Sequence, residues 1–310
     1  MVIITGSVAY DYIMNFPDAF ADHILPDQIH NINLSFIVNK FERRRGGTAG
    51  NVSYTMGLLQ SSQILFSYAG KDFSEYAKAF RKLKISLQHV PIDKKNYTAT
   101  GFAMSDRVNN QIWGYFYGAA ENNQKLQLKT VATSNDLVLI GPAGTEGPIT
   151  FARQCVEHKL PYMLDPGFNL TYVSNEDLQF CVTHADYIIG NDYELHIIRD
   201  RVKNWKHLFS SKIVITTLGE KGAVIQTPTK EYHIKAVPPT AVVDPTGAGD
   251  AWRSGFLAGI EKGFDLQICG QMGSVASAYA IENYGCQEHH FTKKEFAERY
   301  RQSFGDLIEL

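Results

Sequence analysis

The sequence has few cysteines and no excess of charge of either sign. Its 310 residues include only four cysteines, and no two of them form a C-x-x-C pair. A disulfide scaffold is therefore excluded, and free, mostly buried thiols are expected. Lysine and arginine number 30 against 32 aspartates and glutamates. This near balance leaves no global basic field that could hold nucleic acid or a membrane surface.

Long apolar runs are missing as well. The chain has no stretch of 18 apolar residues, and residues 1–6 lack the basic and long apolar regions of a signal peptide. With 44% hydrophobic and 20% charged residues, the composition is that of an ordinary globular protein. We expect a soluble cytoplasmic enzyme of roughly two average domains, without nucleic-acid or membrane partners.

Short apolar runs recur along the chain and predict buried strands. They span residues 2–5, 136–140, 162–164, 187–189 and 212–216, and each precedes a Gly, Pro or Asn and then a helical pattern. Runs without alternation suit strands buried on both faces, and strand–helix alternation implies right-handed crossovers. The predicted fold class is α/β, with a parallel sheet covered by helices.

Helix starts are marked by local signals. Asp72 and Glu75 predict the start of a helix over residues 73–83, and Thr292 with Glu295 predicts a capping box for the last helix. Pro148 fits the first turn of another helix.

Three segments alternate instead, which predicts strands with one solvated face. These are residues 32–39, 97–104 and 111–118. Because open α/β sheets bind ligands at the carboxyl ends of their strands, a small sheet over those ends would form a lid. We predict that residues 1–11, 46–96 and 119–310 form the α/β core. Residues 12–45 and 97–118 would form the β-rich lid over the substrate site.

The segment Val-Asp-Pro-Thr-Gly-Ala-Gly-Asp-Ala-Trp at residues 243–252 precedes a helical pattern. Gly247 and Gly249 allow a tight turn whose N–H groups, together with the helix dipole, form an anion site. Asp250 at that positive end should have a low pKa and faces the place of a phosphate, as a general base must. The alternative interpretation is a glycine turn capped by Asp250. The motifs G-x-x-x-x-G-K-[ST] and G-x-G-x-x-G are absent, which excludes a Walker loop and weakens a dinucleotide-dependent oxidoreductase.

Four motifs resemble those of the ribokinase-like (PfkB) carbohydrate and nucleoside kinases. D-P-T-G-A-G-D at 244–250 resembles their C-terminal signature, and R-G-G-T-A-G-N at 45–51 their N-terminal glycine signature. Residues 190–194 are similar to the N-x-x-E motif, and residues 216–222 to the nucleotide loop T-x-G-x-x-G. Residues 5–11, 25–28, 34–36 and 285–288 most resemble bacterial adenosine kinases. The resemblance implies a three-layer ribokinase-like core with a small lid.

The resemblance also implies roles around the acceptor. Asp250 would take the proton from a sugar hydroxyl, while the amides of Gly247, Ala248 and Gly249 would contact the transferring phosphoryl group. Asp11, expected at the carboxyl end of the first strand, would accept hydrogen bonds from vicinal ribose hydroxyls. The further candidates for binding the acceptor are Gly46 and Gly47, which would let the backbone approach the sugar, together with Asn51 and Ser7. Without the family match, Asp11 could be a turn residue, and the two glycines could be a hinge.

For the cofactor, the resemblance implies ATP and Mg²⁺, with a monovalent cation such as K⁺ as a further candidate. Asn191 and Glu194 would hold hydrated Mg²⁺, although the same pair could simply be a helix capping box. The residues expected to contact the nucleotide are Asn191, Thr217, Gly219, Gly222 and, for the adenine, Asn283.

Contacts to the base are the least determined. Asn169 could bind the base, and Phe168, where adenosine kinases carry an amide, could stack on it or block it. The lid aromatics Phe102, Trp113, Tyr115, Phe116 and Tyr117 could stack on a purine, fill the lid core or form a homodimer face.

For several charged residues we expect lesser roles. Arg43, Arg44 and Arg45 are read as a solvated charge run in which Arg45 could steer phosphate. Arg253 could orient or pair with Asp250. His289 and His290 are expected at the surface.

The predicted reaction is ATP-dependent phosphorylation of a primary hydroxyl of a nucleoside, the 5′-hydroxyl of adenosine. The alternatives are a kinase for another nucleoside or for a sugar such as ribose, and a non-catalytic nucleoside-binding sensor. Asp250 and the Gly-Ala-Gly turn argue against the sensor, which needs no base.

Overall fold

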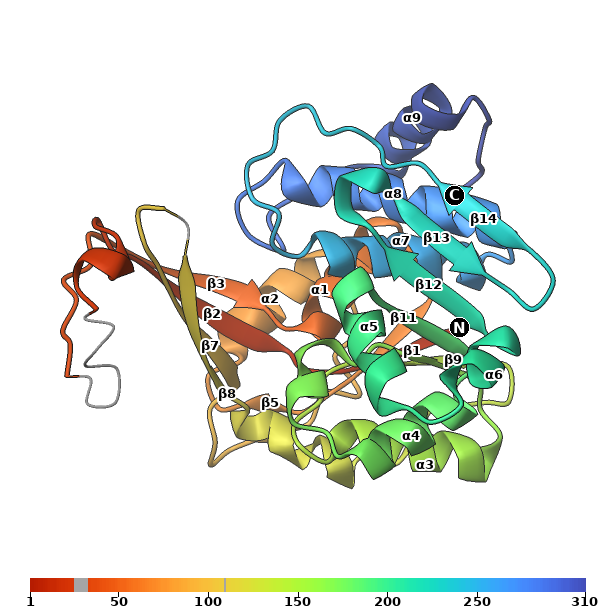
Figure 1. Cartoon of the computed structure of the whole chain (residues 1–310), viewed down its shortest axis with the longest axis horizontal. Coiled ribbons are helices and arrows are strands. Elements are labelled where there is room, and N and C mark those ends of the chain that lie inside the picture. The colour runs from red at the N-terminus through yellow and green to blue at the C-terminus, as the bar shows by residue number, and fades with distance from the viewer. Residues whose placement is uncertain (25–32, 109) are drawn as a thin grey trace.

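The large sheet forms the centre of the molecule. The computed structural model describes residues 1–24, 33–108 and 110–310. Within them, eight strands follow the order β14-β13-β12-β11-β10-β9-β1-β4 (Figure 1). Their bounds are β1 (Val2–Thr5), β4 (Gln63–Phe66), β9 (Leu137–Ile140), β10 (Tyr162–Leu164), β11 (Tyr187–Asn191), β12 (Ile213–Thr217), β13 (Ala223–Gln226) and β14 (Glu231–Ile234).

The five strands predicted from short apolar runs are all present in this sheet. β12, β11, β10, β9, β1 and β4 are parallel to their neighbours, and β13 and β14 add an antiparallel edge. The amino-terminal strand β1 therefore lies inside the sheet, between β9 and β4.

Helices cover both faces of this sheet. Alternate strand residues face opposite ways, so Val2 and Ile4 join one buried apolar cluster and Ile3 joins the other. The first cluster packs against α1 (Thr48–Leu58), α2 (Ser74–Lys82), α7 (Ala248–Glu261), α8 (Leu266–Ile281) and α9 (Lys293–Phe304). The second packs against α3 (Gly147–His158), α4 (Asn175–His184), α5 (Asp192–Arg201) and α6 (Trp205–Ser210). The predicted three-layer α/β core is confirmed.

A second sheet stands to one side of the three-layer body (Figure 1). Its strand order is β3-β2-β7-β8, with bounds β2 (Ala9–Asn15), β3 (Lys40–Gly46), β7 (Ala99–Ser105) and β8 (Gln111–Phe116). Two of the predicted alternating strands are thus present as β7 and β8. β2 begins at Ala9, so Asp11 lies inside a strand of this sheet and not at the end of β1 as expected.

The third alternating segment was predicted wrongly. Residues 33–38 form no strand, and β2 pairs instead with Lys40–Gly46. Ion pairs within this strand reduce the repulsion between its basic side chains, because Glu42 lies 2.6 Å from both Lys40 Nζ and Arg44 Nη2. Ile32 and the motif at 25–28 lie outside the described residues.

The predicted helix starts have mixed outcomes. Thr292 and Glu295 form a reciprocal capping box, and Pro148 lies in the first turn of α3. Asp72 does not cap α2, because its carboxylate accepts hydrogen bonds from the backbone and hydroxyl of Thr98.

Short elements complete the described chain. They are β5 (Ala69–Gly70), β6 (Ile92–Asp93) and the 3₁₀ turns η1 (Phe20–Asp22), η3 (Gly118–Lys125), η4 (Leu128–Thr130), η5 (Gly167–Thr171) and η6 (Gly219–Lys221). Across the described ranges, we find no helix with the length and apolarity needed to cross a bilayer.

Candidate active site

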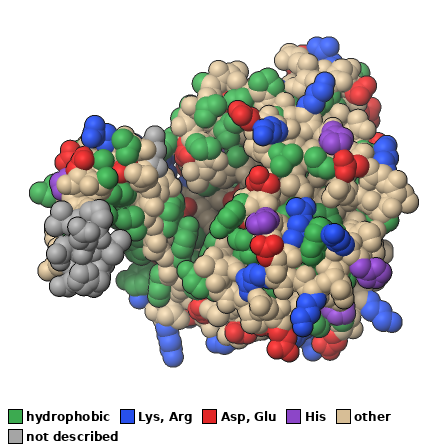
Figure 2. Space-filling model, in the orientation of Figure 1, with side chains coloured by type: hydrophobic (Ala, Val, Ile, Leu, Met, Phe, Trp, Pro, Cys, Tyr) green, Lys and Arg blue, Asp and Glu red, His purple; other side chains and the backbone are tan. Residues whose placement is uncertain are grey.

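Two cavities meet at Asp250. The larger, of about 580 Å³, lies over the carboxyl ends of β10, β11 and β12, and the smaller, of about 180 Å³, lies between the body and the four-stranded sheet. Figure 2 shows a hollow between that sheet and the body. The residues that line both cavities are Thr48, Phe168, Gly247 and Asp250. The site thus has two compartments with one carboxylate between them.

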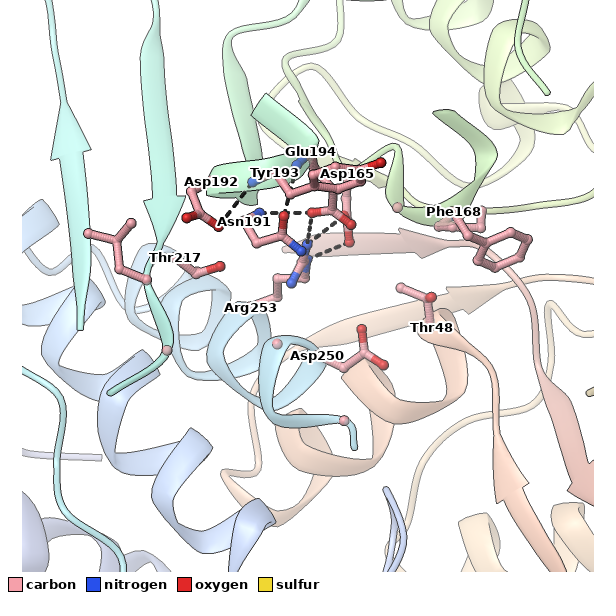
Figure 3. A pocket seen from close by; sticks show the side chains of 16 residues that line it. Thr48, Asp165, Phe168, Asn191, Asp192, Tyr193, Glu194, Thr217, Asp250 and Arg253 are labelled. Carbon is pink, nitrogen blue, oxygen red and sulfur yellow. Dashed lines mark hydrogen bonds and ion pairs between the residues drawn. The ribbon is translucent and has the colours of Figure 1, made fainter. Parts of the chain in front are cut away.

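The start of α7 places Asp250 at this junction. Gly247 precedes the helix with φ +81°, and a Cβ there would lie 2.9 Å from Sγ and Cβ of Cys286. Only glycine adopts this conformation readily and fits this space. The predicted glycine turn is therefore at the helix start, and in Figure 3 the Asp250 side chain points into the larger cavity.

The pKa of Asp250 is raised, which corrects the expected low value. Burial raises it to about 6, although Arg253 and a hydrogen bond from Asn51 oppose the shift. Loss of hydration on burial outweighs these two favourable interactions of the ionised carboxylate. The Asn51 bond is short, with Nδ2 2.7 Å from Asp250 Oδ2. A carboxylate with this pKa is ionised at neutral pH yet can take up a proton.

Arg253 does not pair directly with Asp250. Its Nη2 lies 2.7 Å from Asp165 Oδ1, and its Nε lies 2.5 Å from Asp165 Oδ2 (Figure 3). Arg253 is 7% exposed and Asp165 2% exposed, so the two charges are paired inside the protein and join α7 to the end of β10.

The smaller cavity contains the second carboxylate, Asp11. Burial and the charge of Asp250 raise the pKa of Asp11 to about 7. Gly46 lies outside the cavity lining but leaves room for Asp11, because a Cβ there would collide with Asp11 Oδ2. The other predicted acceptor residues on this wall are Ser7, Gly47, Asn51, Tyr115 and Phe168.

Gly47 explains how α1 and β2 approach each other so closely. Its φ is +84°, and a Cβ there would lie 2.5 Å from the carbonyl oxygen of Ser7. The backbone before α1 can therefore pack directly on the start of β2.

Asn191 and Glu194 lie in the wall of the larger cavity and form the capping box of α5. The Asn191 N–H donates to Glu194 Oε2, and the Glu194 N–H donates to Asn191 Oδ1, each at 2.8 Å. Within the described chain, no hydrogen-bond partner is found for Glu194 Oε1. Burial raises the pKa of this carboxyl. Oxygen donors of this kind suit hydrated Mg²⁺, so the capping role and a cation-binding role are compatible.

Aromatic rings separate the smaller cavity from a third one, of about 560 Å³. Tyr115 stacks between Trp113 and Phe168, with centroid distances of 5.5 and 4.8 Å. Asn169 lies behind them, accepting a hydrogen bond from Tyr117 Oη at 2.9 Å and donating to the Gly144 carbonyl. The rings of Trp113, Tyr115 and Phe168 thus form both a stack and a wall of the smaller cavity.

Thr217 and Gly219 line the larger cavity, but several other expected residues lie elsewhere. Phe102 stacks on Tyr12, Asn283 donates to the Tyr279 carbonyl, and Gly222 packs near Ile234; none of the three lines either of the first two cavities.

Two predictions about charged residues were wrong. Arg45 is not a free solvated charge, since its Nη2 lies 3.0 Å from Glu288 Oε1. His289 is fully buried, 2.9 Å from Thr55 Oγ1, whereas its neighbour His290 is exposed.

Sequence reasoning missed Thr48, Asp165 and Gln287 as site residues. A signal existed for Asp165, since it directly follows a predicted parallel strand. Gln287 belongs to one of the segments that resemble the kinase family, but nothing local indicated that it contacts Asn51.

Comparisons with known proteins find similar chains over nearly the whole sequence. The family model described as pfkB family carbohydrate kinase matches residues 5–293. A solved structure of a Burkholderia thailandensis nucleoside kinase with inosine has a TM-score of 0.89 and 32% identity, covering 99% of each chain. The same enzyme with ADP-inosine has a TM-score of 0.87 and 34% identity, covering 100% of this chain and 98% of that one. A nucleoside kinase of Methanocaldococcus jannaschii is 29% identical over 95% of this chain and 94% of its own.

Proposed function

This chain belongs to the pfkB family of carbohydrate kinases, and we propose that it phosphorylates the 5′-hydroxyl of a nucleoside with ATP, adenosine being the first candidate. The position of Asp250 between two cavities carries the proposal. Phosphoryl transfer needs a donor on one side of the reacting atoms and an acceptor on the other, with a base that reaches the acceptor hydroxyl. Similarity over nearly the whole chain to proteins named nucleoside kinases supports a nucleoside acceptor.

In the proposed complex, the smaller cavity holds the nucleoside. Asp11 accepts hydrogen bonds from the ribose hydroxyls, which favours its ionised form. The 5′-hydroxyl then lies at Asp250, which takes its proton as the oxygen attacks phosphorus. Residues 9–15, 40–46, 99–105 and 111–116 act as the lid that excludes water from this compartment.

The larger cavity holds ATP in this proposal. Thr217 and Gly219 contact the nucleotide, and Asn191 and Glu194 hold hydrated Mg²⁺, which neutralises charge on the phosphates when bound. The N–H groups of Gly247 and Gly249 donate to the transferring group, whose charge spreads over its outer oxygens. The N–H of Ala248, which was also expected to contact this group, already donates to the Pro245 carbonyl at 3.2 Å.

An ADP-release assay with MgATP tests the proposal. The acceptors are adenosine, inosine, cytidine and ribose, with 5′-deoxyadenosine as the matched compound that lacks the reacting hydroxyl. We expect nucleosides to exceed ribose by at least about tenfold in kcat/KM, because contacts to the base add binding that ribose lacks. 5′-Deoxyadenosine should inhibit without turnover.

The outcomes separate the alternatives. Ribose as good as the best nucleoside would identify a sugar kinase, and inosine or cytidine above adenosine would replace adenosine as acceptor. Nucleoside binding without ADP release would indicate a sensor.

A further inference from the structure

A buried amide, Gln287, links the two sides of the active site. Its side chain is 1% exposed, and its Nε2 lies 2.8 Å from Asn51 Oδ1 and 2.6 Å from Tyr76 Oη. One amide nitrogen therefore donates to two side chains from different helices, α1 and α2.

The bond to Asn51 determines which end of that amide faces Asp250. Gln287 donates to the oxygen end of Asn51, and the nitrogen end donates to Asp250 Oδ2 at 2.7 Å. If the Asn51 amide were reversed, its nitrogen would meet the Gln287 donor and its oxygen would meet the carboxylate. The contact between the two nitrogens would be repulsive in every case, and the contact between the two oxygens would be repulsive unless Asp250 carried a proton.

The bond to Tyr76 links Gln287 to the wall of the smaller cavity near Asp11. Tyr76 Oη donates to the Gly46 carbonyl at 2.8 Å, and Gly46 packs directly against the Asp11 carboxylate. Tyr76 is fully buried and Asn51 is 5% exposed, so water cannot readily replace these donors.

We propose that Gln287 is a positioning residue, which holds the Asn51 amide with its NH₂ group toward Asp250 and thereby keeps the base ionised. The inference rests on the proposed role of Asp250 as the base. Gln287 touches no reacting atom itself, so it acts on the rate through the protonation state of Asp250.

The test is the pH profile of kcat for Gln287→Met and Gln287→Glu. Methionine keeps the volume but removes both donors, and a carboxylate at this position offers acceptors that draw the Asn51 NH₂ group away from Asp250. In both variants we expect the acidic limb of kcat to move up by at least about half a pH unit. At pH 7, kcat should fall with the ionised fraction of Asp250, by about a sixth for a shift of half a unit and by more for a larger shift, and it should recover at pH 9. The KM for ATP should change less than about twofold.

Gln154→Met is the matched control. Gln154 is also a buried amide, 7% exposed, and bonds only the backbone of Leu126 and Leu128, away from the site. It should lower Tm without moving the pH profile.

A double-mutant cycle with Asn51→Ala tests whether Gln287 acts through Asn51. In the Asn51→Ala background, Gln287→Met should add no further shift. Folded Gln287 variants with an unmoved acidic limb, or additive shifts in the cycle, would overturn the inference. Asp250→Asn distinguishes a failure of this inference from a failure of the proposed function. If that variant keeps more than about a tenth of the parent's turnover, Asp250 is not the base at all, and the proposed mechanism fails together with the role of Gln287.

Discussion

At the scale of single residues, Asp11 combines a raised pKa with a position in the smaller cavity. Burial and Asp250 raise that pKa to about 7, so in the proposed complex a proton competes with the ribose hydroxyls for the carboxylate. We expect the KM for the nucleoside to rise as pH falls below about 7, whereas the KM for ATP stays constant. Asp11→Asn should raise the nucleoside KM by about tenfold or more at pH 8, since hydrogen bonds to charged groups contribute about 1.5–3 kcal/mol. It should also flatten the pH dependence.

Initial-rate kinetics from pH 5.5 to 8.5 measure both effects. Equal losses for ATP and nucleoside in the Asp11→Asn variant would remove Asp11 from the acceptor compartment.

Phe168 is the second residue whose role a single substitution can resolve. It lines both cavities and stacks on Tyr115 at 4.8 Å. If a base stacks on it, Phe168→Ala should lower kcat/KM for the nucleoside by about tenfold, because base–aromatic stacking contributes about 1–3 kcal/mol, and leave ribose unchanged. Phe102→Ala is the control, since that ring stacks on Tyr12 outside the cavity. Faster turnover of larger purines in Phe168→Ala would instead show that the ring blocks the base.

At the scale of elements, the start of α5 combines a capping box with a candidate magnesium ligand. Glutamine can replace glutamate in such a box, so Glu194→Gln keeps the cap but removes the charge. We expect the Mg²⁺ concentration for half-maximal rate to rise about tenfold or more, with Tm nearly unchanged. Glu295→Gln makes the same change in the capping box of α9 and should alter neither quantity. An unchanged Mg²⁺ requirement in Glu194→Gln would leave Glu194 as a cap alone.

Elements were predictable where one local signal determined them. The strand at residues 2–5 is apolar on both faces because both faces are covered, and the Thr292–Glu295 box is a local motif. The strand at Lys40–Gly46 was not predictable, since two of its basic side chains meet acidic partners that are distant in the sequence. Arg43 lies 3.4 Å from Glu75, and Arg45 lies 3.0 Å from Glu288.

The residues of the candidate site likewise divide into those that a local signal predicts and those that it does not. The glycine turn before Asp250 can be predicted from the sequence, because residues 243–250 contain the whole motif. The burial of His289 depends on Thr55, 234 residues away. Arg253 pairs with Asp165, 88 residues away, and not with its near neighbour Asp250. Contacts of this range depend on the sheet order, which local patterns do not encode.

At the scale of the whole molecule, the two site carboxylates affect the stability of the fold. Burial raises both pKa values, to about 7 for Asp11 and about 6 for Asp250, so the folded chain binds protons more tightly than the unfolded chain. Their contribution to the free energy of unfolding is therefore fully present below about pH 4, the pKa of a free aspartate, and is lost progressively as pH rises to about 6 to 7.

We expect Asp11→Asn to raise Tm above the parent by an amount that grows from pH 5 to pH 8, reaching about 4 °C or more. Asp93→Asn is the control of opposite sign. Hydrogen bonds from Asn96 and the Lys95 backbone lower the Asp93 pKa to about 2, so its Tm loss should be the same at both pH values. Thermal unfolding followed by circular dichroism gives these values, and a Tm difference for Asp11→Asn that does not vary with pH would contradict the linkage.

The long-range contacts at Asp250 also have a consequence for biosynthesis. Asn51 and Asp250 are 199 residues apart, and Gln287 and Asn51 are 236 apart, while β1 pairs with both β4 and the much later β9. Because the amino end of a chain leaves the ribosome first, Asp11 and Asn51 emerge long before the residues that contact them in the site. A nascent chain that has not yet reached residue 287 lacks the side chain that donates to Asn51 and Tyr76. In the proposed mechanism, phosphoryl transfer can therefore begin only after nearly the whole sequence has been translated.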